Sequence, residues 1–139
     1  MDVQGARALF AAARRVCFAS TGRDGQPHLV PVTFAMPIRD SVVFAVDHKP
    51  KTTTRLQRLA NVRDNPRVSL LADGYDDADW TRLWWVRADA TATVLDAGSP
   101  RWEVAVDALA GRYAQYQTHR PAGPVVWCTV ERWVSWSAT

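Results

Sequence analysis

Residues 41–71 read S-V-V-F-A-V-D-H-K-P-K-T-T-T-R-L-Q-R-L-A-N-V-R-D-N-P-R-V-S-L-L, and the rest of the chain is interpreted around this stretch. The β-branched run Val42–Val46 predicts a strand, which the corner H-K-P-K interrupts. A helix is expected to begin near Thr52, because apolar residues then recur at helical spacing. The corner holds the only two lysines of the chain, Lys49 and Lys51. Two ammonium groups beside the free N–H groups of a helix start predict a phosphate-binding corner.

The expected helix also carries a polar strip beside its apolar stripe. Arg55, Arg58 and Asn61 recur at spacings of three residues, which places them next to one another on the helix surface. For Lys51 and Arg58 we predict contact with a ligand. For Arg55 and Asn61, ligand contact and an ordinary solvated helix face explain the pattern equally well.

The totals are those of one globular domain. We expect 139 residues to form a single domain, 1–139. The apolar runs are far shorter than the roughly 20 residues of a membrane span, and the N-terminus lacks the pattern of a secretion signal. Cys17 and Cys128 lie in separate strand-like runs and are interpreted as core residues of a cytoplasmic protein. The net charge of +3 suits an anionic ligand.

Upstream of this stretch, the sequence predicts a helix over Gly5–Arg15 and a hairpin of strands Val16–Ser20 and His28–Ala35. Pro31 lies inside the second of these strands. Proline donates no ladder hydrogen bond, so it belongs at a sheet edge, at a bulge, or where another molecule lies against the backbone. His28, next to the turn, is interpreted as a surface or packed histidine.

Downstream, a strand is expected over Val68–Ala72, followed by an acidic loop without the ligand spacing of a calcium site. No metal site is predicted. The next strand places Trp84 and Trp85 on opposite faces. One tryptophan then belongs to the core, and the other needs a neighbouring subunit, a planar ligand or the stem of Arg87. A helix from Pro100 to about Tyr116 and a closing pair of strands complete the chain.

This order of elements is neither a sandwich of short strands nor a series of βαβ units. It predicts a mainly β, α+β fold: a small antiparallel barrel with helices at its ends. Seven tryptophans are more large aromatic surface than a monomer of this size needs to bury, so a homodimer is expected.

The fragments together resemble a known family. Three fragments occur in the order typical of the pyridoxamine 5′-phosphate oxidase-like split-barrel superfamily. They are T-G-R-D-G-Q-P-H-L-V-P-V-T-F, V-V-F-A-V-D-H-K-P-K and N-P-R-V-S-L-L-A-D. The tract D-W-T-R-L-W-W-V-R most resembles its branch of probable coenzyme F420-dependent enzymes. The resemblance covers about residues 8–136.

This resemblance implies a homodimer of six-stranded antiparallel split barrels with a cofactor in each groove at the interface. It places the phosphates at the basic corner and helix start, and the ring along the second strand. Relatives often carry the phosphate-binding basic residue nearer the end of the helix, where Arg58 is the counterpart instead of Lys51. Together with the interpretation of the residues, the predicted cofactor contacts are Pro31, Val32, Thr33, Lys49, Lys51, Thr52, Arg55, Arg58, Asn61 and Trp85.

The expected function is hydride transfer between F420, the deazaflavin cofactor, and a small organic acceptor. No catalytic residue is assigned, because a proton could come from Tyr75, His28 or water. Two alternatives share the fold: an FMN-binding oxidoreductase and a carrier that binds F420 or a flavin without turnover. A nucleic-acid or protein-interaction module is disfavoured, because no such binding motif is present.

Overall fold

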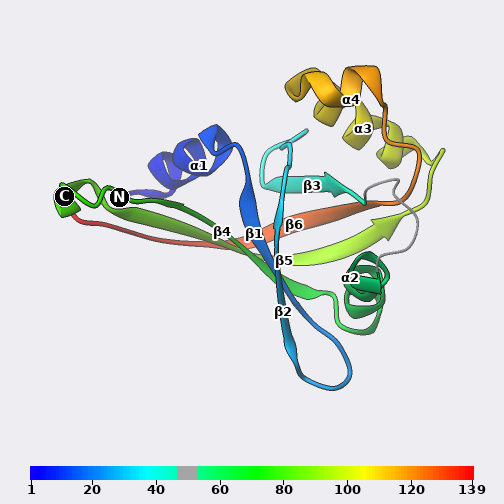
Figure 1. Ribbon diagram of the computed structural model, residues 1–139, viewed down its shortest axis with the longest axis horizontal. Helices are drawn as coiled ribbons and strands as arrows, with labels where there is room; N and C mark the ends of the chain where they lie inside the picture. The colour runs from blue at the N-terminus through cyan, green and yellow to red at the C-terminus, as the bar shows by residue number, and fades with distance from the viewer. Residues whose placement is uncertain (47–52) are drawn as a thin grey trace.

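Six antiparallel strands form one sheet in the order β2-β1-β4-β5-β6-β3. The computed structural model describes residues 1–46 and 53–139. The sheet curls into a half-barrel (Figure 1), which confirms the expected α+β split-barrel architecture. The strands are β1 (Val16–Thr21), β2 (Pro27–Val32), β3 (Ser41–Ala45), β4 (Arg67–Gly74), β5 (Trp84–Leu95) and β6 (Val125–Ser137).

The helices lie around this sheet, with α2 near the β1–β2 hairpin and the pair α3 and α4 beyond β3 (Figure 1). No helix in the described part of the chain is long and apolar enough to cross a membrane. Helix α3 begins at Pro100 as predicted, and Ser99 caps it, since its Oγ accepts a hydrogen bond from the backbone N–H of Trp102. The helices are α1 (Val3–Ala12), α2 (Thr53–Asp64), α3 (Pro100–Arg112), α4 (Ala114–Thr118) and the 3₁₀ turn η1 (Trp80–Arg82).

The inner face of the half-barrel holds the main core. Phe18 of β1 and Phe44 of β3 meet edge to face, with ring centroids 4.7 Å apart. Phe10 of α1 is fully buried at the same core. Leu59 and Val62 of α2 join it from the other end. Helices α1 and α2 therefore each close the half-barrel with one apolar side, as the spacing of their apolar residues predicts.

A second core lies on the opposite face of β3 and β6. There α3 contributes Trp102, Val106 and Leu109, which pack with Val43 and Trp127. Strand β3 is consequently buried on both faces. This double burial explains why residues 42–46 form a continuous apolar run and do not alternate with polar residues.

Two predicted elements end earlier than expected at one junction. Strand β2 ends at Val32 and not at Ala35, because the backbone of Phe34 is bonded to α3 and its end instead of a strand. The hydroxyl of Tyr113 accepts from the Phe34 N–H at 3.1 Å, and Arg112 donates to the Phe34 carbonyl at 3.0 Å. The predicted helix to Tyr116 is interrupted because Tyr113 has extended backbone angles.

The first helix ends at Ala12 and not at Arg15. The carbonyl end of this helix is in contact with a positive charge from another element. Arg112 of α3 donates hydrogen bonds to the carbonyls of Ala11 and Ala13. The predicted closing pair of strands is one continuous strand, β6, whose register with β5 shifts between Asp89 and Ala90.

Candidate functional site

Strand β2 is one of the two edges of the sheet in its described residues, with β1 as its neighbour in the strand order. Pro31, opposite Cys17, is exposed on this edge strand, which confirms the edge interpretation. Val32 points into the core with 6% of its surface exposed, whereas Thr33 is exposed. Of the three residues predicted to lie along a ring, Pro31 and Thr33 therefore present their side chains to solvent.

Part of the outward face of β1, β2 and β4 is apolar, and no described residue of the single chain covers it. The strand register sets Pro31, Cys17 and Leu71 side by side across three strands. Leu29 and Leu71 are 66% and 40% exposed. Cys17 is also exposed, so its interpretation as a core residue is wrong, whereas Cys128 is buried as predicted. The result is an exposed apolar surface, which we call the open face, defined by Cys17, Leu29, Pro31 and Leu71.

A cavity of about 720 Å³ adjoins the open face on the same side of the sheet. Its floor contains an ion pair in which Nε of Arg87 lies 2.8 Å from Oδ1 of Asp89. The Ser69 hydroxyl donates to the same oxygen at 2.9 Å. Burial acts to raise the pKa of Asp89, but the hydrogen bonds from Arg87 and Ser69 prevail and lower it. The carboxylate therefore stays charged.

Sequence reasoning did not find this cavity. The available signal was the alternation R-A-D-A-T at residues 87–91, which places Arg87 and Asp89 on one face of a strand. The missing information was the register of β6, whose irregularity opposite Asp89 brings both Glu131 and Arg132 to the cavity wall. Irregularities of this kind recur beside binding sites.

The predicted phosphate-binding corner is only partly covered by the structure. Lys49, Lys51 and Thr52 lie outside the described residues. Helix α2 includes Arg55, whose side chain is not described, and the half-buried Arg58. Phosphate binding by this group stays a prediction.

Asn61 lies inside the protein, with 3% of its surface exposed. Its side-chain amide donates to the Ser20 hydroxyl at 3.3 Å and accepts from the Gln57 amide at 2.7 Å. These contacts join α2 to β1. The amide is thus engaged within the chain, and its contact with a cofactor stays a prediction.

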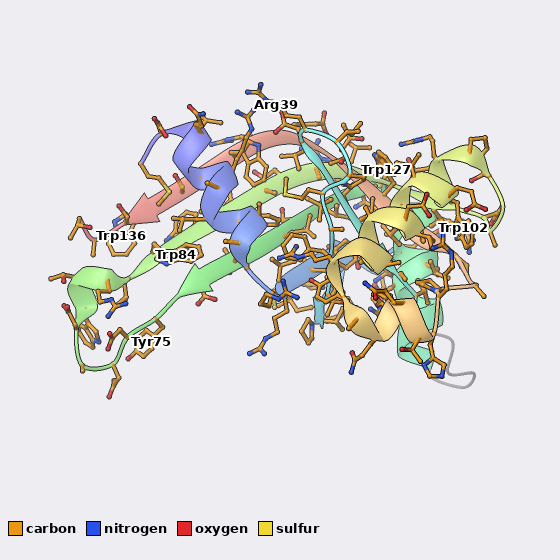
Figure 2. The ribbon with its side chains drawn as sticks, turned by 90° about the horizontal axis from the view of Figure 1, so that it is seen from above. Arg39, Tyr75, Trp84, Trp102, Trp127 and Trp136 are labelled. Carbon is orange, nitrogen blue, oxygen red and sulfur yellow. The ribbon has the colours of Figure 1, made fainter. Side chains whose placement is uncertain are left out.

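The two adjacent tryptophans separate as predicted. Trp84 packs against the inner core. Trp85 is half-buried on the outward face, where its neighbours in the ladder are Asp73 and Trp136. Figure 2 shows Trp84 and Trp136 at the end of the molecule opposite to Trp102 and Trp127. Trp85 thus belongs to the outward face that also carries the open face.

The candidate proton donors do not converge on Pro31 and Thr33. Tyr75 is 64% exposed in the loop between β4 and β5 (Figure 2), and its hydroxyl donates to Asp77 at 2.9 Å. His28 lies on the face of β2 opposite to Pro31 and is half-buried toward the inside of the half-barrel. The geometry assigns neither residue a catalytic role.

Comparison with known proteins places this arrangement in context. Residues 3–137 match the model of the family described as pyridoxamine 5′-phosphate oxidase. The match covers almost the whole chain. A search of curated proteins finds no match to the chain.

Several solved structures share the fold. The conserved hypothetical protein Rv2991 of Mycobacterium tuberculosis is 22% identical, with a TM-score of 0.76 over 99% of this chain and 86% of that one. An FAD-binding protein of Mesorhizobium loti is 18% identical, with a TM-score of 0.74 over 97% and 92%. The heme storage protein HutZ of Vibrio cholerae is 13% identical, with a TM-score of 0.72 over 97% and 93%.

Proposed function

The chain belongs to the pyridoxamine 5′-phosphate oxidase family, and from this premise we propose that it is an F420-dependent oxidoreductase. In this proposal, a homodimer holds the deazaflavin cofactor at its interface, and a small organic molecule is the partner in hydride transfer. The single observation that carries the proposal is the edge strand β2, which presents Pro31 and Thr33 to solvent beside the open face.

The open face suits a planar ring. Cys17, Pro31 and Leu71 offer an apolar surface without bulky projections, and apolar contact with a ring releases water from both. Pro31 has no N–H group, so a ring that lies against it leaves no backbone donor unsatisfied. Thr33 supplies a hydroxyl at the end of this surface. These residues would bind and orient the ring of the cofactor.

The anionic part of the cofactor is assigned to the basic corner. Lys49, Lys51, Thr52, Arg55 and Arg58 combine positive charge with a helix start, and F420 carries a phosphodiester and several carboxylates. Charge-assisted hydrogen bonds to phosphate are stronger than neutral ones. This assignment explains why the lysines of the chain are confined to one corner.

The proposed second subunit would cover the open face. Leu29 and Leu71, at 66% and 40% exposed, lie in neighbouring rows of this face. Apolar patches of this kind on otherwise polar surfaces mark interaction sites. A second copy is the proposed occupant, since one closed pair of identical faces buries both. The same contact would exclude water from the ring.

When bound, the deazaflavin supplies the hydride-transferring carbon. The protein then needs to hold that ring and an acceptor such as an enone or imine in reactive contact. A carrier that binds the same cofactor without turnover would use the same groove. An FMN-binding oxidoreductase is the second candidate, because a flavin ring and its single phosphate fit the same two places.

The test is a titration of the purified protein with F420 and with FMN, followed by ligand fluorescence. F420 binding without FMN binding supports the proposal. FMN binding alone overturns the choice of cofactor in favour of the FMN oxidoreductase, and binding of neither rejects both. Reduced F420 is then mixed with a panel of enones, and oxidation of the cofactor separates an enzyme from a carrier. Heme is included as a third ligand. Its binding tests whether this protein has a role in heme storage, the function named for HutZ.

A further inference from the structure

Two tyrosines from the end of α3 reach the segment that follows β2. Helix α3 ends at Arg112, and Tyr113 has φ −118° and ψ 122°, so the chain turns before α4 begins. Because of this turn, the hydroxyls of Tyr113 and Tyr116 both reach the segment of Thr33 and Phe34. Their rings meet edge to face with centroids 5.9 Å apart. The pair therefore lies at the end of the proposed ring-binding strand.

The hydroxyl of Tyr113 is engaged by the protein both as donor and as acceptor. It accepts a hydrogen bond from the N–H of Phe34 at 3.1 Å. Its single proton has two carbonyl acceptors within 2.9 Å, those of Arg14 and Phe34. A phenol has one donor and two acceptor positions. Tyr113 thus acts as a structural link between α3, the segment after β2 and the segment after α1.

The hydroxyl of Tyr116 is used differently. Its one partner among the described residues is Oγ1 of Thr33, at 3.3 Å. Hydrogen bonds between hydroxyls are usually about 2.7–2.8 Å long, so this contact is weak. Whichever hydroxyl donates its single proton in this contact, the other keeps its own proton available for a ligand, and both keep acceptor capacity. Thr33 is exposed and Tyr116 is half-buried, so a ligand can approach both from solvent.

The placement of this pair matches the direction of the proposed ring. Pro31 and Thr33 lie on either side of the buried Val32 along the chain, and both are exposed to solvent. A planar ligand on the apolar surface at Pro31 therefore meets the hydroxyls of Thr33 and Tyr116 at its edge. One hydroxyl can donate while the other accepts, which matches a ring edge with a carbonyl next to an N–H group.

We propose that Tyr116, together with Thr33, is a ligand-positioning pair that holds the carbonyl and N–H edge of a planar heterocycle lying against Pro31. The inference rests on the proposed function, because it needs a ring along β2. It adds a residue from α4 to the site and names the chemical class of ring edge that the site selects.

The experiment compares Tyr116→Phe with Tyr113→Phe, two substitutions that each remove one hydroxyl. FMN and F420 are titrated against each variant and against the unaltered protein, by fluorescence and by the absorption band of the bound ring. Loss of one neutral hydrogen bond predicts that Tyr116→Phe weakens binding about three- to tenfold and shifts the band. Its thermal midpoint should stay unchanged, whereas Tyr113→Phe should lower the midpoint.

Thr33→Val provides the second test, because it removes the partner hydroxyl with little change in shape. If the two hydroxyls act as one pair, Tyr116→Phe and Thr33→Val combined weaken binding less than the product of the single effects. A protein that binds neither ligand rejects the proposed function and this inference with it. Tight binding by the unaltered protein together with equal affinity and an identical band in Tyr116→Phe rejects the inference alone.

Discussion

Oδ1 of Asn61 lies so close to Gly22 that a Cβ atom on this glycine would meet it at 2.4 Å. The amide cannot easily move away, because Gln57 donates to it at 2.7 Å and its own N–H bonds to Ser20. Gly22→Ala should therefore destabilise the fold by about 1–3 kcal/mol, the usual range for overpacking. Urea unfolding followed by tryptophan fluorescence measures this loss.

The control for Gly22→Ala is the same substitution combined with Asn61→Ala. Removing the amide opens the space that the new methyl group needs, so the double variant should be more stable than the two single losses predict. Simple additivity would show that the contact does not matter. The same Asn61→Ala protein also tests the predicted cofactor contact, because a purely structural amide leaves ligand affinity unchanged once the protein is folded.

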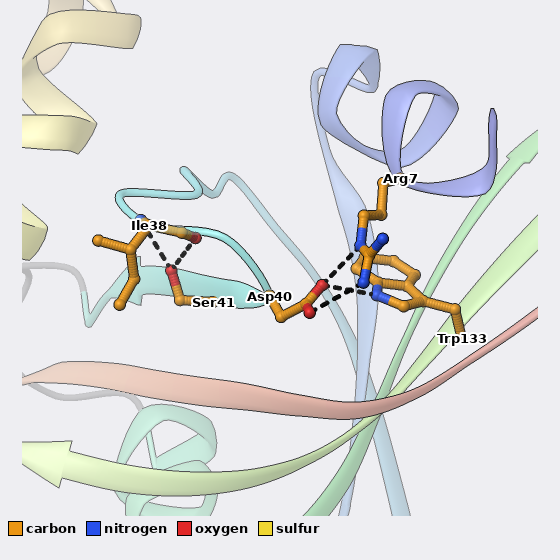
Figure 3. A network of polar contacts seen from close by, with 5 residues as sticks. All are labelled: Arg7, Ile38, Asp40, Ser41 and Trp133. Atoms are coloured by element: carbon orange, nitrogen blue, oxygen red, sulfur yellow. Dashed lines mark hydrogen bonds and ion pairs between the residues drawn. The ribbon is translucent and has the colours of Figure 1, made fainter. Parts of the chain in front are cut away.

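Asp40 makes stability dependent on pH. Its carboxylate accepts hydrogen bonds from Nε of Arg7 at 2.8 Å and Nε1 of Trp133 at 2.9 Å (Figure 3). The bond from Arg7 is the largest influence and lowers the pKa of Asp40; burial opposes this lowering, and the Trp133 bond adds to it. A carboxylate with a lowered folded pKa stabilises the protein above its unfolded pKa. This contribution is lost as the pH falls through the folded pKa.

Asp40→Asn should accordingly lower the urea midpoint at pH 7 and flatten its decline below pH 4. Asparagine is the matched replacement, since Asp40 has a φ of 58° and asparagine tolerates this region. Asp40→Ala combines loss of the carboxylate with backbone strain and should be less stable than Asp40→Asn. An unaltered acid-unfolding profile in Asp40→Asn would assign the acid sensitivity to another carboxylate.

The inward and outward sides of the strands could be predicted because burial alternates along them, whereas the six-stranded split barrel was implied by the family resemblance. His28 and Val32 face inward and Pro31 outward as the period of two requires, and the apolar stripe of α2 reaches the core through Leu59 and Val62. These features depend on residues close together in the sequence. The missing N–H group of Pro31 limited it to an edge, a bulge or a contact with another molecule, and the strand order identifies the edge.

Features that depend on contacts between distant segments were missed. Phe34 reads as a strand residue, yet its backbone is bonded to Tyr113, 79 positions away. The same contact ends α3 early, although its apolar spacing continues to Tyr113. The cavity at Asp89 needs the register of β6, which one irregular position shifts. Periodicity describes a segment and contains no information on which partner will satisfy its backbone.

The proposed dimer predicts protection of a cysteine. Cys17 is exposed in the single chain on the open face, whereas Cys128 is buried and burial raises the pKa of its thiol. A second copy over the open face should make the alkylation of Cys17 slow at high protein concentration and fast on dilution. Cys128 should react only after unfolding, because the thiolate is the reactive form. Mass spectrometry of the alkylated peptides distinguishes the two residues.

Leu71→Glu is designed to disrupt this dimer. It places a charge on the 40%-exposed leucine next to Cys17 without altering the core. Sedimentation should show a monomer, and Cys17 should then react rapidly at every concentration. Val104→Glu is the control, because Val104 is 47% exposed on α3, away from the open face. Rapid alkylation of Cys17 in the unaltered protein at all concentrations would contradict coverage of this face.

Lys51 and Arg58 are the two candidates for binding the phosphate at the basic corner. Their substitutions should have different effects on affinity and thermal stability. Lys51→Ala should weaken F420 binding by about 1–3 kcal/mol, the range for a hydrogen bond to a charged group, and leave thermal stability nearly unchanged. Arg58 is half-buried on α2, so Arg58→Ala should lower both affinity and the thermal midpoint, since an arginine stem also packs. Arg58→Lys keeps the charge but loses the planar fork of donors, and separates binding from packing. Unchanged F420 affinity in Lys51→Ala, with a large loss in Arg58→Lys, would place the phosphate one turn inside the helix instead of at its mouth.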